Sequence, residues 1–422
     1  MLCQFSFENY KAFKEEALLD FIAEPIKEYR ESLIVDKADE EKFIPVVAIY
    51  GPNGGGKSTV LEALEYVRLI IIQKIVLSRV QEDKKYEVMF QKMSRDVYRE
   101  KYHRFSPECK ELPSWFEILF RTGGYQFKYQ ISVKHSLITE ENLYMQPVGQ
   151  EEVYIMFERN QEECVLGEEI EGIAVEKVSD SMPLLTHIAI NYDVDLINLV
   201  IDWFFDIEVL NYDNPQKDRQ ILIPQTKEGR NRMFEMMKQM DIQIADVRLV
   251  KDIDGNITAL YAQHILENGE KCEILFEEES SGTRKLFSFL SRCLSCLETG
   301  SLLVADELDA KLHPKILQYI IELFTNPHTN INGAQLLLTS HDIVTMSPKV
   351  FRRDEIWFCA KNPVGASTLY SLVSFKKENG LQPRNDEVYG KRYIEGHYGA
   401  DPYVKKILSW EEIDEPETKE SK

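Results

Sequence analysis

The chain has 422 residues, with 50 lysines and arginines against 71 aspartates and glutamates, and its formal net charge is −21. This length, together with 44% hydrophobic residues, predicts a folded protein of two to three structural units and excludes a short disulfide-stapled peptide or a disordered chain. The acidic balance disfavours a protein that coats nucleic acid through its overall charge, because phosphate binding depends on lysine and arginine. It does not exclude a local basic groove.

The cysteines and the apolar stretches indicate a cellular compartment. The seven cysteines are odd in number and irregularly spaced, and the chain starts at Met1 without a basic and then apolar leader. The most apolar stretch, residues 67–80, is interrupted by Arg68 and Arg79 and is shorter than the ~20 residues that a membrane-spanning helix needs. We therefore expect a cytoplasmic protein without a membrane helix.

The pattern of the first hundred residues predicts two strands, a helix and a polar helical segment. Residues 2–7 alternate apolar and polar side chains, and residues 44–50 form a continuous apolar run typical of a buried parallel strand. From Ser58 to about Val80 the apolar residues recur at helical spacing. Charged residues then accumulate as far as Phe105 and predict a polar helical segment.

The middle of the chain predicts an antiparallel sheet and a helical lobe. Residues 125–134 alternate with a period of two, which is typical of a sheet with one solvent-facing side. Apolar helices are predicted at residues 195–205 and 231–240, followed by a hairpin with Asp254 and Gly255 at its turn.

The last third returns to alternating helices and buried strands. Helices are predicted at residues 283–297 and 314–324, and strands at residues 301–306, 334–340 and 355–360. This alternation, after the strand and helix near the start of the chain, predicts an α/β fold with a large insertion.

A glycine-rich segment carries the clearest chemical signal. GPNGGGKST matches the phosphate-loop pattern G-x-x-x-x-G-K-[ST] between a buried strand and an amphipathic helix. The glycines let successive backbone amides surround a phosphate, and the helix N-terminus adds partial positive charge. Lys57 is expected to reach the β- and γ-phosphates and Ser58 to bind Mg²⁺. The predicted nucleotide-binding loop consists of Gly51, Pro52, Asn53, Gly54, Gly55, Gly56, Lys57, Ser58 and Thr59.

An acidic pair ends the apolar strand that begins near residue 301. Such a pair by itself commonly marks only the end of a strand, but beside a phosphate loop it fits a catalytic role. Asp306 is expected to hold the shell of Mg²⁺, and Glu307 to orient and deprotonate the attacking water.

Two further segments indicate the class of ATPase. Ser281 and Gly282 open a predicted helix before Asp306, and His341 follows a buried strand after it. In this order the set resembles the ABC-type ATPase head, with a phosphate loop, a signature (SSGTR here), an acidic pair, a D-loop and a switch histidine. The resemblance implies ATP as ligand and two heads that sandwich two ATP molecules. One head would give Lys57, Ser58, Asp306, Glu307 and His341, and the other would give Ser281, Gly282 and Asp309.

The ends of the chain narrow this resemblance. Residues 3–13, CQFSFENYKAF, and residues 306–314, DELDAKLHP, are similar to segments of the RecF, SMC and OLD group. Residues 384–402, RNDEVYGKRYIEGHYGADP, resemble the end of the abortive-infection AAA-type ATPases, which include RloA, AbiL, the ATPase of PARIS-type systems and the PtuA relatives. The pattern departs at Gly55, and no Q-loop glutamine is assigned, with Gln91 and Gln126 as candidates.

The resemblance implies a fold, a process and partners. The fold would be an α/β P-loop NTPase with an ABC-type head, a mixed and mainly parallel core sheet, an antiparallel sheet and an inserted helical arm or lobe. The process would be antiphage defence, with a homodimeric or larger ATPase that controls a separate effector of TOPRIM, RloB or HNH type. We predict these segments: head with phosphate loop (1–75), helical arm (76–112), antiparallel sheet and helical lobe (113–270), rest of the head (271–380) and C-terminal extension with an acidic tail (381–422).

Other interpretations stay open at this stage. A DNA-maintenance ATPase of the RecF kind would need a basic groove and would bind duplex DNA in a salt-dependent way. A transporter's ATP-binding subunit fits less well, because the signature is not LSGGQ. Cys293 and Cys296 fit buried small residues better than a metal or redox pair. The basic and aromatic run at residues 99–105 fits a solvated helical face better than a nucleic-acid contact.

Overall fold

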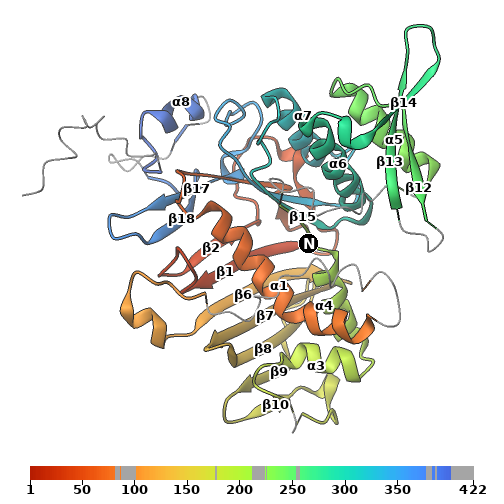
Figure 1. Ribbon diagram of the computed structural model, residues 1–422. Coiled ribbons are helices and arrows are strands. Elements are labelled where there is room, and N and C mark those ends of the chain that lie inside the picture. Colours follow the sequence, from red (N-terminus) through yellow and green to blue (C-terminus); the bar gives the residue numbers. More distant parts are fainter. Residues whose placement is uncertain are drawn as a thin grey trace, which may run out of the picture.

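Two large sheets organise the molecule, as Figure 1 shows. The computed structural model describes residues 1–80, 86, 101–175, 178–211, 224, 226–252, 257–376, 383–384 and 387–400. Gln91, the predicted turn at residues 254–255 and the acidic tail lie outside these residues, as does most of the predicted helical arm.

The six-stranded sheet carries the predicted site. Its strands run in the order β11, β15, β16, β5, β17 and β18. The first five are parallel, and β18 is antiparallel to β17. The carboxyl ends of the parallel strands therefore meet at one edge. The bounds are β5 (Val46–Tyr50), β11 (Glu208–Asn211), β15 (Leu302–Asp306), β16 (Gln335–Thr339), β17 (Ile356–Lys361) and β18 (Ser367–Ser371).

Helices cover both faces of this sheet, which explains why every residue of β5 is buried. Val47 and Ile49 belong to the core that α1 shares with the antiparallel sheet, and α1 runs between the two sheets in Figure 1. Val46 and Ala48 belong to a second core with α6 and α7. The bounds are α1 (Lys57–Arg79), α6 (Ser281–Thr299) and α7 (Pro314–Thr325).

The second sheet is antiparallel throughout and runs in the order β10, β9, β8, β7, β6, β1 and β2. The period-two alternation at residues 125–134 is confirmed as β7. Alternate buried residues of this sheet pack with α1, α3 (Leu184–Asn191) and α4 (Asp195–Asp206). The strands are β1 (Leu2–Glu8), β2 (Ala17–Asp20), β6 (Ser114–Thr122), β7 (Tyr125–Lys134), β8 (Leu137–Pro147), β9 (Tyr154–Asn160) and β10 (Cys164–Leu166).

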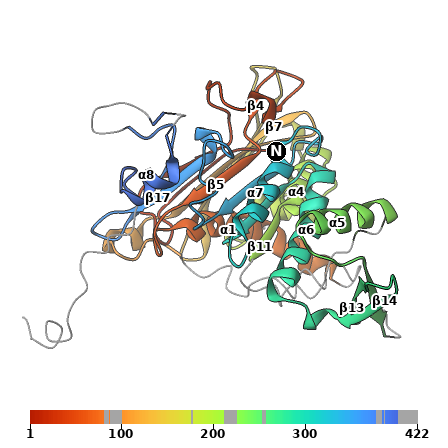
Figure 2. The same ribbon diagram turned by 90° about the horizontal axis from the view of Figure 1, so that it is seen from above.

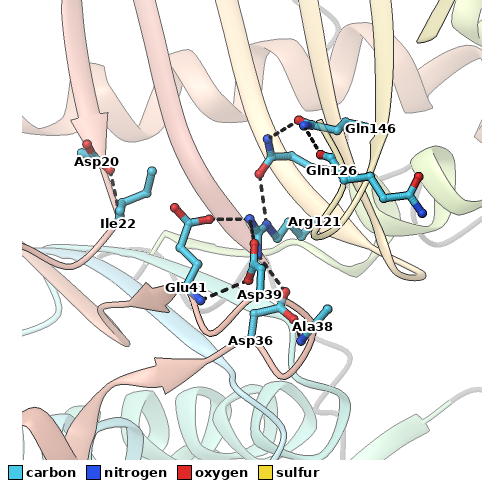
Figure 3. A network of polar contacts seen from close by, with 10 residues as sticks. Asp20, Ile22, Asp36, Ala38, Asp39, Glu41, Arg121, Gln126 and Gln146 are labelled. Carbon is cyan, nitrogen blue, oxygen red and sulfur yellow. Dashed lines mark hydrogen bonds and ion pairs between the residues drawn. The ribbon is translucent and has the colours of Figure 1, made fainter. Parts of the chain in front are cut away.

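A buried arginine ties the small hairpin of β3 (Ile34–Val35) and β4 (Lys42–Phe43) to this sheet (Figure 3). The guanidinium of Arg121 donates to Asp36 at 3.0 Å, to Asp39 at 2.8 Å and to Glu41. Its Nε donates to the side-chain oxygen of Gln126 at 3.0 Å. The candidate Q-loop residue Gln126 thus belongs to a structural cluster on β7.

A third, three-stranded sheet stands apart on the right of Figure 1 with α5 (Lys227–Gln239). It joins the six-stranded part through aromatic packing, because the rings of Phe276 and Phe287 meet at 4.9 Å in an edge-to-face arrangement. The strands are β12 (Asp246–Lys251), β13 (Ile257–Ile265) and β14 (Lys271–Leu275).

The structure differs from the sequence expectations in three places. The strand β11 joins the parallel sheet beside β15, although residues 113–270 were expected to form a separate antiparallel sheet and lobe. Helix α6 starts at Ser281 rather than Thr283, because the Ser280 side chain caps it by accepting from Thr283 N at 3.1 Å. The solvated helix expected at residues 99–105 is wrong for residues 101–105, which form no helix.

His103 gives the physical reason for that last difference. Its side chain is 1% exposed, and its backbone amide donates to the side-chain oxygen of Asn9 at 3.0 Å. The amide nitrogen of Asn9 in turn donates to the carbonyls of Cys109 and Leu112. This turn after β1 therefore holds the segment in an irregular path against the sheet.

No single helix in the described ranges is long and apolar enough to cross a membrane. Helices α3 and α4 meet the length and composition only jointly, across a bend of 112°.

Candidate nucleotide-binding site

The predicted site residues gather at the carboxyl edge of the six-stranded sheet. The phosphate loop follows β5, the acidic pair ends β15, and the residues before His341 end β16. These three strands are neighbours, so segments far apart in the sequence meet there. In open α/β sheets, this edge is where ligands bind.

Two glycines of the phosphate loop are required by close approach and by backbone geometry. A Cβ atom on Gly51 would lie 2.4 Å from the Cys359 carbonyl oxygen on the neighbouring strand β17. Gly56 has a φ of +103°, and a Cβ atom there would lie 2.9 Å from Ser367 Oγ and 3.0 Å from the Phe13 ring. Any larger residue would push the loop out of its path between β17 and the turn after β1.

The N-terminus of α1 is open to an anion. Gly56 is its N-cap residue and has no side chain that could accept from the first amides of the helix. Lys57 is buried, and its Nζ donates to the carbonyl oxygens of Gly51 at 2.9 Å and Pro52 at 3.3 Å. Burial lowers the pKa of Lys57 below its usual value. An ammonium held over the loop, next to free helix amides, forms a cradle for phosphate oxygens.

The carboxylate of Asp306 is shared by hydroxyl groups of two other elements. Ser58 Oγ donates to Asp306 Oδ1 at 3.1 Å, and Thr339 Oγ1 donates to the same oxygen at 2.6 Å. Two cis ligands of one octahedral Mg²⁺, each ~2.0–2.1 Å from the ion, lie about 2.9 Å apart. Ser58 and Asp306 therefore fit the metal that the motif implies. No set of three or more His, Cys, Asp or Glu residues in the described ranges forms a metal site by itself.

Glu307 is held by its backbone and not by its side chain. Its φ is +51°, a left-handed value that a non-glycine residue adopts only under constraint. The constraint is a hydrogen bond from its amide to Thr339 Oγ1 at 2.7 Å. Within the described ranges no hydrogen bond engages the Glu307 carboxylate.

A hydrogen bond joins the backbone of His341 to the side chain of Asp309. The amide of His341 donates to Asp309 Oδ2 at 3.1 Å. The other carboxylate oxygen, Oδ1, is buried and has no hydrogen-bond partner in the part of the chain that the structure describes. The side chain of His341 is exposed at the mouth of the site.

The two signature residues sit at the N-terminus of α6. The atoms nearest to a Cβ built on Gly282 are Lys311 O at 3.5 Å and Ser280 Oγ at 3.8 Å. Ser281 is the first residue of the helix. Within the chain, the closest neighbour of Gly282 outside its own turn is thus the segment after Asp309.

A pocket of about 450 Å³ lies in front of the phosphate loop. Gly51, Pro52 and Asn53 form one wall with Tyr50, and Ser340 and His341 form another. The remaining lining residue is Tyr393 of α8 (Tyr389–Ile394), which the sequence analysis did not assign to the site.

Thr339 is the second functional residue that the sequence analysis missed. It is the last residue of β16 and touches both members of the acidic pair. A hydroxyl at the end of an otherwise apolar strand, just before Ser340 and His341, was the available signal. Its role depends on β16 lying beside β15, which the sequence does not display.

The cysteines take no part in this chemistry. Cys293 and Cys296 are buried on α6 in the core that covers the sheet, which confirms their interpretation as small core residues. Cys359, next to Gly51, is buried as well, and burial raises the pKa of its thiol to about 12. It therefore stays neutral beside Lys57.

Comparison with known proteins places these features in a family. A protein-family model described as "AAA domain, putative AbiEii toxin, Type IV TA system" matches residues 46–347. The chain belongs to this AAA family. The matched residues include the phosphate loop, the acidic pair, Ser281, Gly282 and His341. The fold class predicted from the sequence, a P-loop NTPase with a mixed, mainly parallel core sheet and an added antiparallel sheet, is confirmed.

Solved structures of SMC heads share a distant likeness with the AAA-family chain. The SMC head domain from Thermotoga maritima is 12% identical, covers 88% of this chain and 98% of that one, and gives a TM-score of 0.41. An SMC head bound to the C-winged helix domain of ScpA is 11% identical, with coverages of 88% and 97% and a TM-score of 0.43. A Pyrococcus furiosus head with an extended coiled coil, bound to the C-terminal domain of ScpA, is 11% identical, with coverages of 88% and 96% and a TM-score of 0.42. No curated protein matches the chain.

Proposed function

We propose that this AAA-family protein is a Mg²⁺-dependent ATPase whose heads pair around ATP and work as a two-state switch. The observation that carries the proposal is the meeting of Ser58, Asp306 and Thr339 at one carboxylate oxygen, with the free carboxylate of Glu307 on the next residue. A phosphate loop alone would bind a nucleotide. The added carboxylate supplies a group for hydrolysis.

Each residue has a task in this reaction. The loop amides, the α1 N-terminus and Lys57 bind the phosphates, and Ser58 with Asp306 would hold Mg²⁺, which neutralises charge on the phosphates. Glu307 orients a water molecule and accepts its proton while the water oxygen bonds to the γ-phosphorus. The bond from that phosphorus to the ADP oxygen breaks, and ADP leaves with the electron pair. His341 lines the pocket in front of the phosphate loop, where it would face the γ-phosphate.

The proposed dimer completes the site from a second head. Ser281 and Gly282 open α6 with a helix N-terminus that the Ser280 side chain caps only in part. Such a terminus favours a γ-phosphate approaching from outside the chain. Asp309 Oδ1 also has no hydrogen-bond partner among the described residues. ATP would hold the heads together, and hydrolysis would release them, so that a few kcal/mol of differential contact sets the switch.

The proposed process is antiphage defence of the abortive-infection type in the cytoplasm. The family description names an AbiEii toxin, and the resemblance of residues 384–402 points the same way. The protein would act as sensor or scaffold and control a separate nuclease-like effector of TOPRIM, RloB or HNH type. Duplex DNA binding that weakens steeply with salt would instead support the alternative role in DNA maintenance.

The test of hydrolysis is the variant Glu307→Gln. It keeps the size and the backbone of Glu307 but cannot accept the proton, so turnover should fall ~10²–10⁴-fold, the usual contribution of a positioned acid or base. ATP binding should persist. The matched control is Glu31→Gln, an exposed glutamate away from the site, which should hydrolyse ATP like the wild type. Wild-type turnover in Glu307→Gln would remove that residue from catalysis.

The test of the paired heads mixes two inactive variants. Ser281→Arg places a bulky cation at the α6 N-terminus and should block pairing while its own Lys57 still binds ATP. Lys57→Ala binds ATP about 10²-fold more weakly but keeps Ser281. A mixed dimer contains one intact site, so mixing should restore part of the activity. If the two variants assemble together and remain inactive, the chain hydrolyses ATP within a single head or not at all.

A further inference from the structure

A short C-terminal segment, residues 387–400, packs against the loop that carries His341. We call residues 340–346 the switch loop. The amide of Gly390 donates to the Met346 carbonyl at 3.1 Å. A Cβ atom on Gly390 would lie only 2.4 Å from the Ile343 carbonyl oxygen. Because Gly390 is a helical residue of α8, its small size matters here and not its backbone freedom.

Stacked aromatic rings anchor the same segment to the sheet. The ring of Phe358 on β17 stacks with Tyr393 at 5.7 Å and 11°, and with Tyr398 at 5.3 Å and 30°. The hydroxyl of Tyr393 donates to the carbonyl of Ala400 at 3.0 Å. Both views show α8 beside β17, on the side away from α5 and the three-stranded sheet (Figures 1 and 2).

The pairing of β17 with β5 connects these stacked rings to the phosphate loop. Phe358 pairs with Tyr50, the residue before Gly51. Tyr393 then lines the pocket together with Gly51 and His341. One segment therefore contacts both β17, the strand paired with β5, and the switch loop.

We propose that residues 387–400 are a positioning element of the nucleotide site, in which α8 fixes the switch loop and Tyr393 closes the pocket wall. The element sets where His341 lies and, through the bond from the His341 amide to Asp309, where the D-loop carboxylate lies. The inference rests on the proposed ATPase function. The groups that cradle the phosphates, Lys57 and the α1 N-terminus, make their contacts without α8.

The inference predicts a separation of turnover from binding. In Gly390→Ala the added methyl group must displace the Ile343 carbonyl, because real Cβ atoms do not approach an oxygen to 2.4 Å. A misplacement of about 1 Å in a catalytic group can cost ~10²-fold in rate. We therefore expect kcat to fall ~10- to 100-fold while the affinity for ATP stays close to that of the wild type.

The matched control changes the neighbouring residue of the same helix. Lys391 is exposed and pairs only with Glu395 at 3.8 Å within the described ranges. Lys391→Ala should leave kcat, ATP affinity and melting temperature unchanged. A second pair of variants tests the pocket wall: Tyr393→Ala should lower kcat, and Tyr393→Phe, which keeps the stack on Phe358, should restore most of it.

The experiment measures kcat, equilibrium ATP binding and melting temperature for the full chain. Wild-type kcat in a folded Gly390→Ala protein would overturn the positioning role, as would an equal loss in Tyr393→Ala and Tyr393→Phe. If Gly390→Ala does not fold, the Tyr393 pair decides alone. A wild-type chain that binds ATP but never hydrolyses it would contradict the proposed function instead, and this outcome is separate because it appears before any variant is compared.

Discussion

The two ends of the six-stranded sheet differ in whether their buried polar groups have hydrogen-bond partners. At the amino end, Gln335 is 1% exposed and exchanges both of its side-chain hydrogen bonds with the backbone of Leu2 on the other sheet, at 2.7 and 2.9 Å. Arg352 is 0% exposed and donates to carboxylate and carbonyl oxygens. At the carboxyl end, Asp309 Oδ1 and Ser367 Oγ are buried without a partner in the described chain.

This difference separates structural polar groups from functional ones. A buried polar group that finds all its partners within the chain stabilises the fold and offers nothing to a ligand. Groups left incomplete at the carboxyl edge, next to an open helix N-terminus, keep their hydrogen bonds for a ligand. The sheet therefore uses one edge to join its neighbours and the other to hold a nucleotide.

The largest expected effect is a loss of stability, with unchanged ATP turnover, in a variant of a buried residue at the amino end of the sheet. The Arg352 guanidinium donates to Asp354 at 2.9 and 2.7 Å and also reaches the carbonyls of Glu24 and Glu28. Arg352→Met leaves a buried carboxylate without its partner, which costs ~3–5 kcal/mol. Urea unfolding should show this loss, whereas kcat per folded molecule should match the wild type. An Arg352→Met variant with wild-type stability but without ATP turnover would show that Arg352 is functional rather than structural.

At the carboxyl end the expected pattern is the opposite. Lys57→Ala removes a charged donor from the phosphate cradle, and such a bond is worth ~1.5–3 kcal/mol, so ATP affinity should fall by about 10²-fold. The free energy of unfolding without ATP should change little, since among the described residues Lys57 donates to carbonyls of its own loop. Equilibrium ATP binding measures the effect. Lys315→Ala, an exposed lysine on α7, is the control and should bind like the wild type.

Thr339 gives a smaller effect that tests the bridge between the acidic residues. Thr339→Val keeps the shape of the side chain but loses the hydroxyl that contacts Asp306 and the Glu307 amide. We expect kcat to fall ~10-fold, because one hydrogen bond to a charged group is lost. Thr339→Ser retains the hydroxyl and should stay near the wild type. Equal losses in both variants would assign the effect to strand packing instead.

Thr339 also shows where sequence reasoning ends. The phosphate loop and the acidic pair are contiguous motifs, and the buried strands around them have a continuous apolar pattern, so both could be predicted from local spacing alone. The bridge by Thr339 and the wall formed by Tyr393 depend on strand order and on a C-terminal segment folding back. The same limit explains β11, whose place beside β15 is a matter of tertiary pairing.

The prediction of a helix at residues 99–105 failed for a different physical reason, which His103 shows. The residues around it form a charged run with a helical pattern, but tertiary hydrogen bonds hold the segment irregular. The His103 amide donates to the Asn9 side chain at 3.0 Å, and the Lys11 amide donates to the Lys101 carbonyl at 2.6 Å. Helix propensity is a weak preference of a few tenths of a kcal/mol per residue, and a tertiary hydrogen bond overrides it. A helix predicted from a charged segment alone is therefore easily overridden by tertiary hydrogen bonds.

Glu355 is the exception at the amino end, and it yields the most specific prediction. One of its carboxylate oxygens accepts from the Arg352 amide at 2.8 Å, but the other is buried without a partner in the described residues. The pKa of Glu355 is raised to about 8, mainly by burial; the Arg352 amide and charge oppose this shift, and the nearby Asp354 adds to it. The folded protein thus keeps a proton that the unfolded chain releases.

The sign of the resulting pH dependence follows from that proton. Between the ordinary glutamate pKa of ~4.3 and the folded value of about 8, the folded state binds more protons than the unfolded state, so the free energy of unfolding falls as pH rises. Glu355→Gln removes this titration. We expect the variant to match the wild type near pH 5 and to be more stable than the wild type near pH 8.5, because it lacks the titration that lowers wild-type stability over this range. Glu31→Gln, an exposed control, should keep the wild-type slope. Urea unfolding at the two pH values measures both, and a Glu355→Gln variant less stable than the wild type at pH 8.5 would mean that the ionised carboxylate contributes to the fold like the other polar groups of this edge.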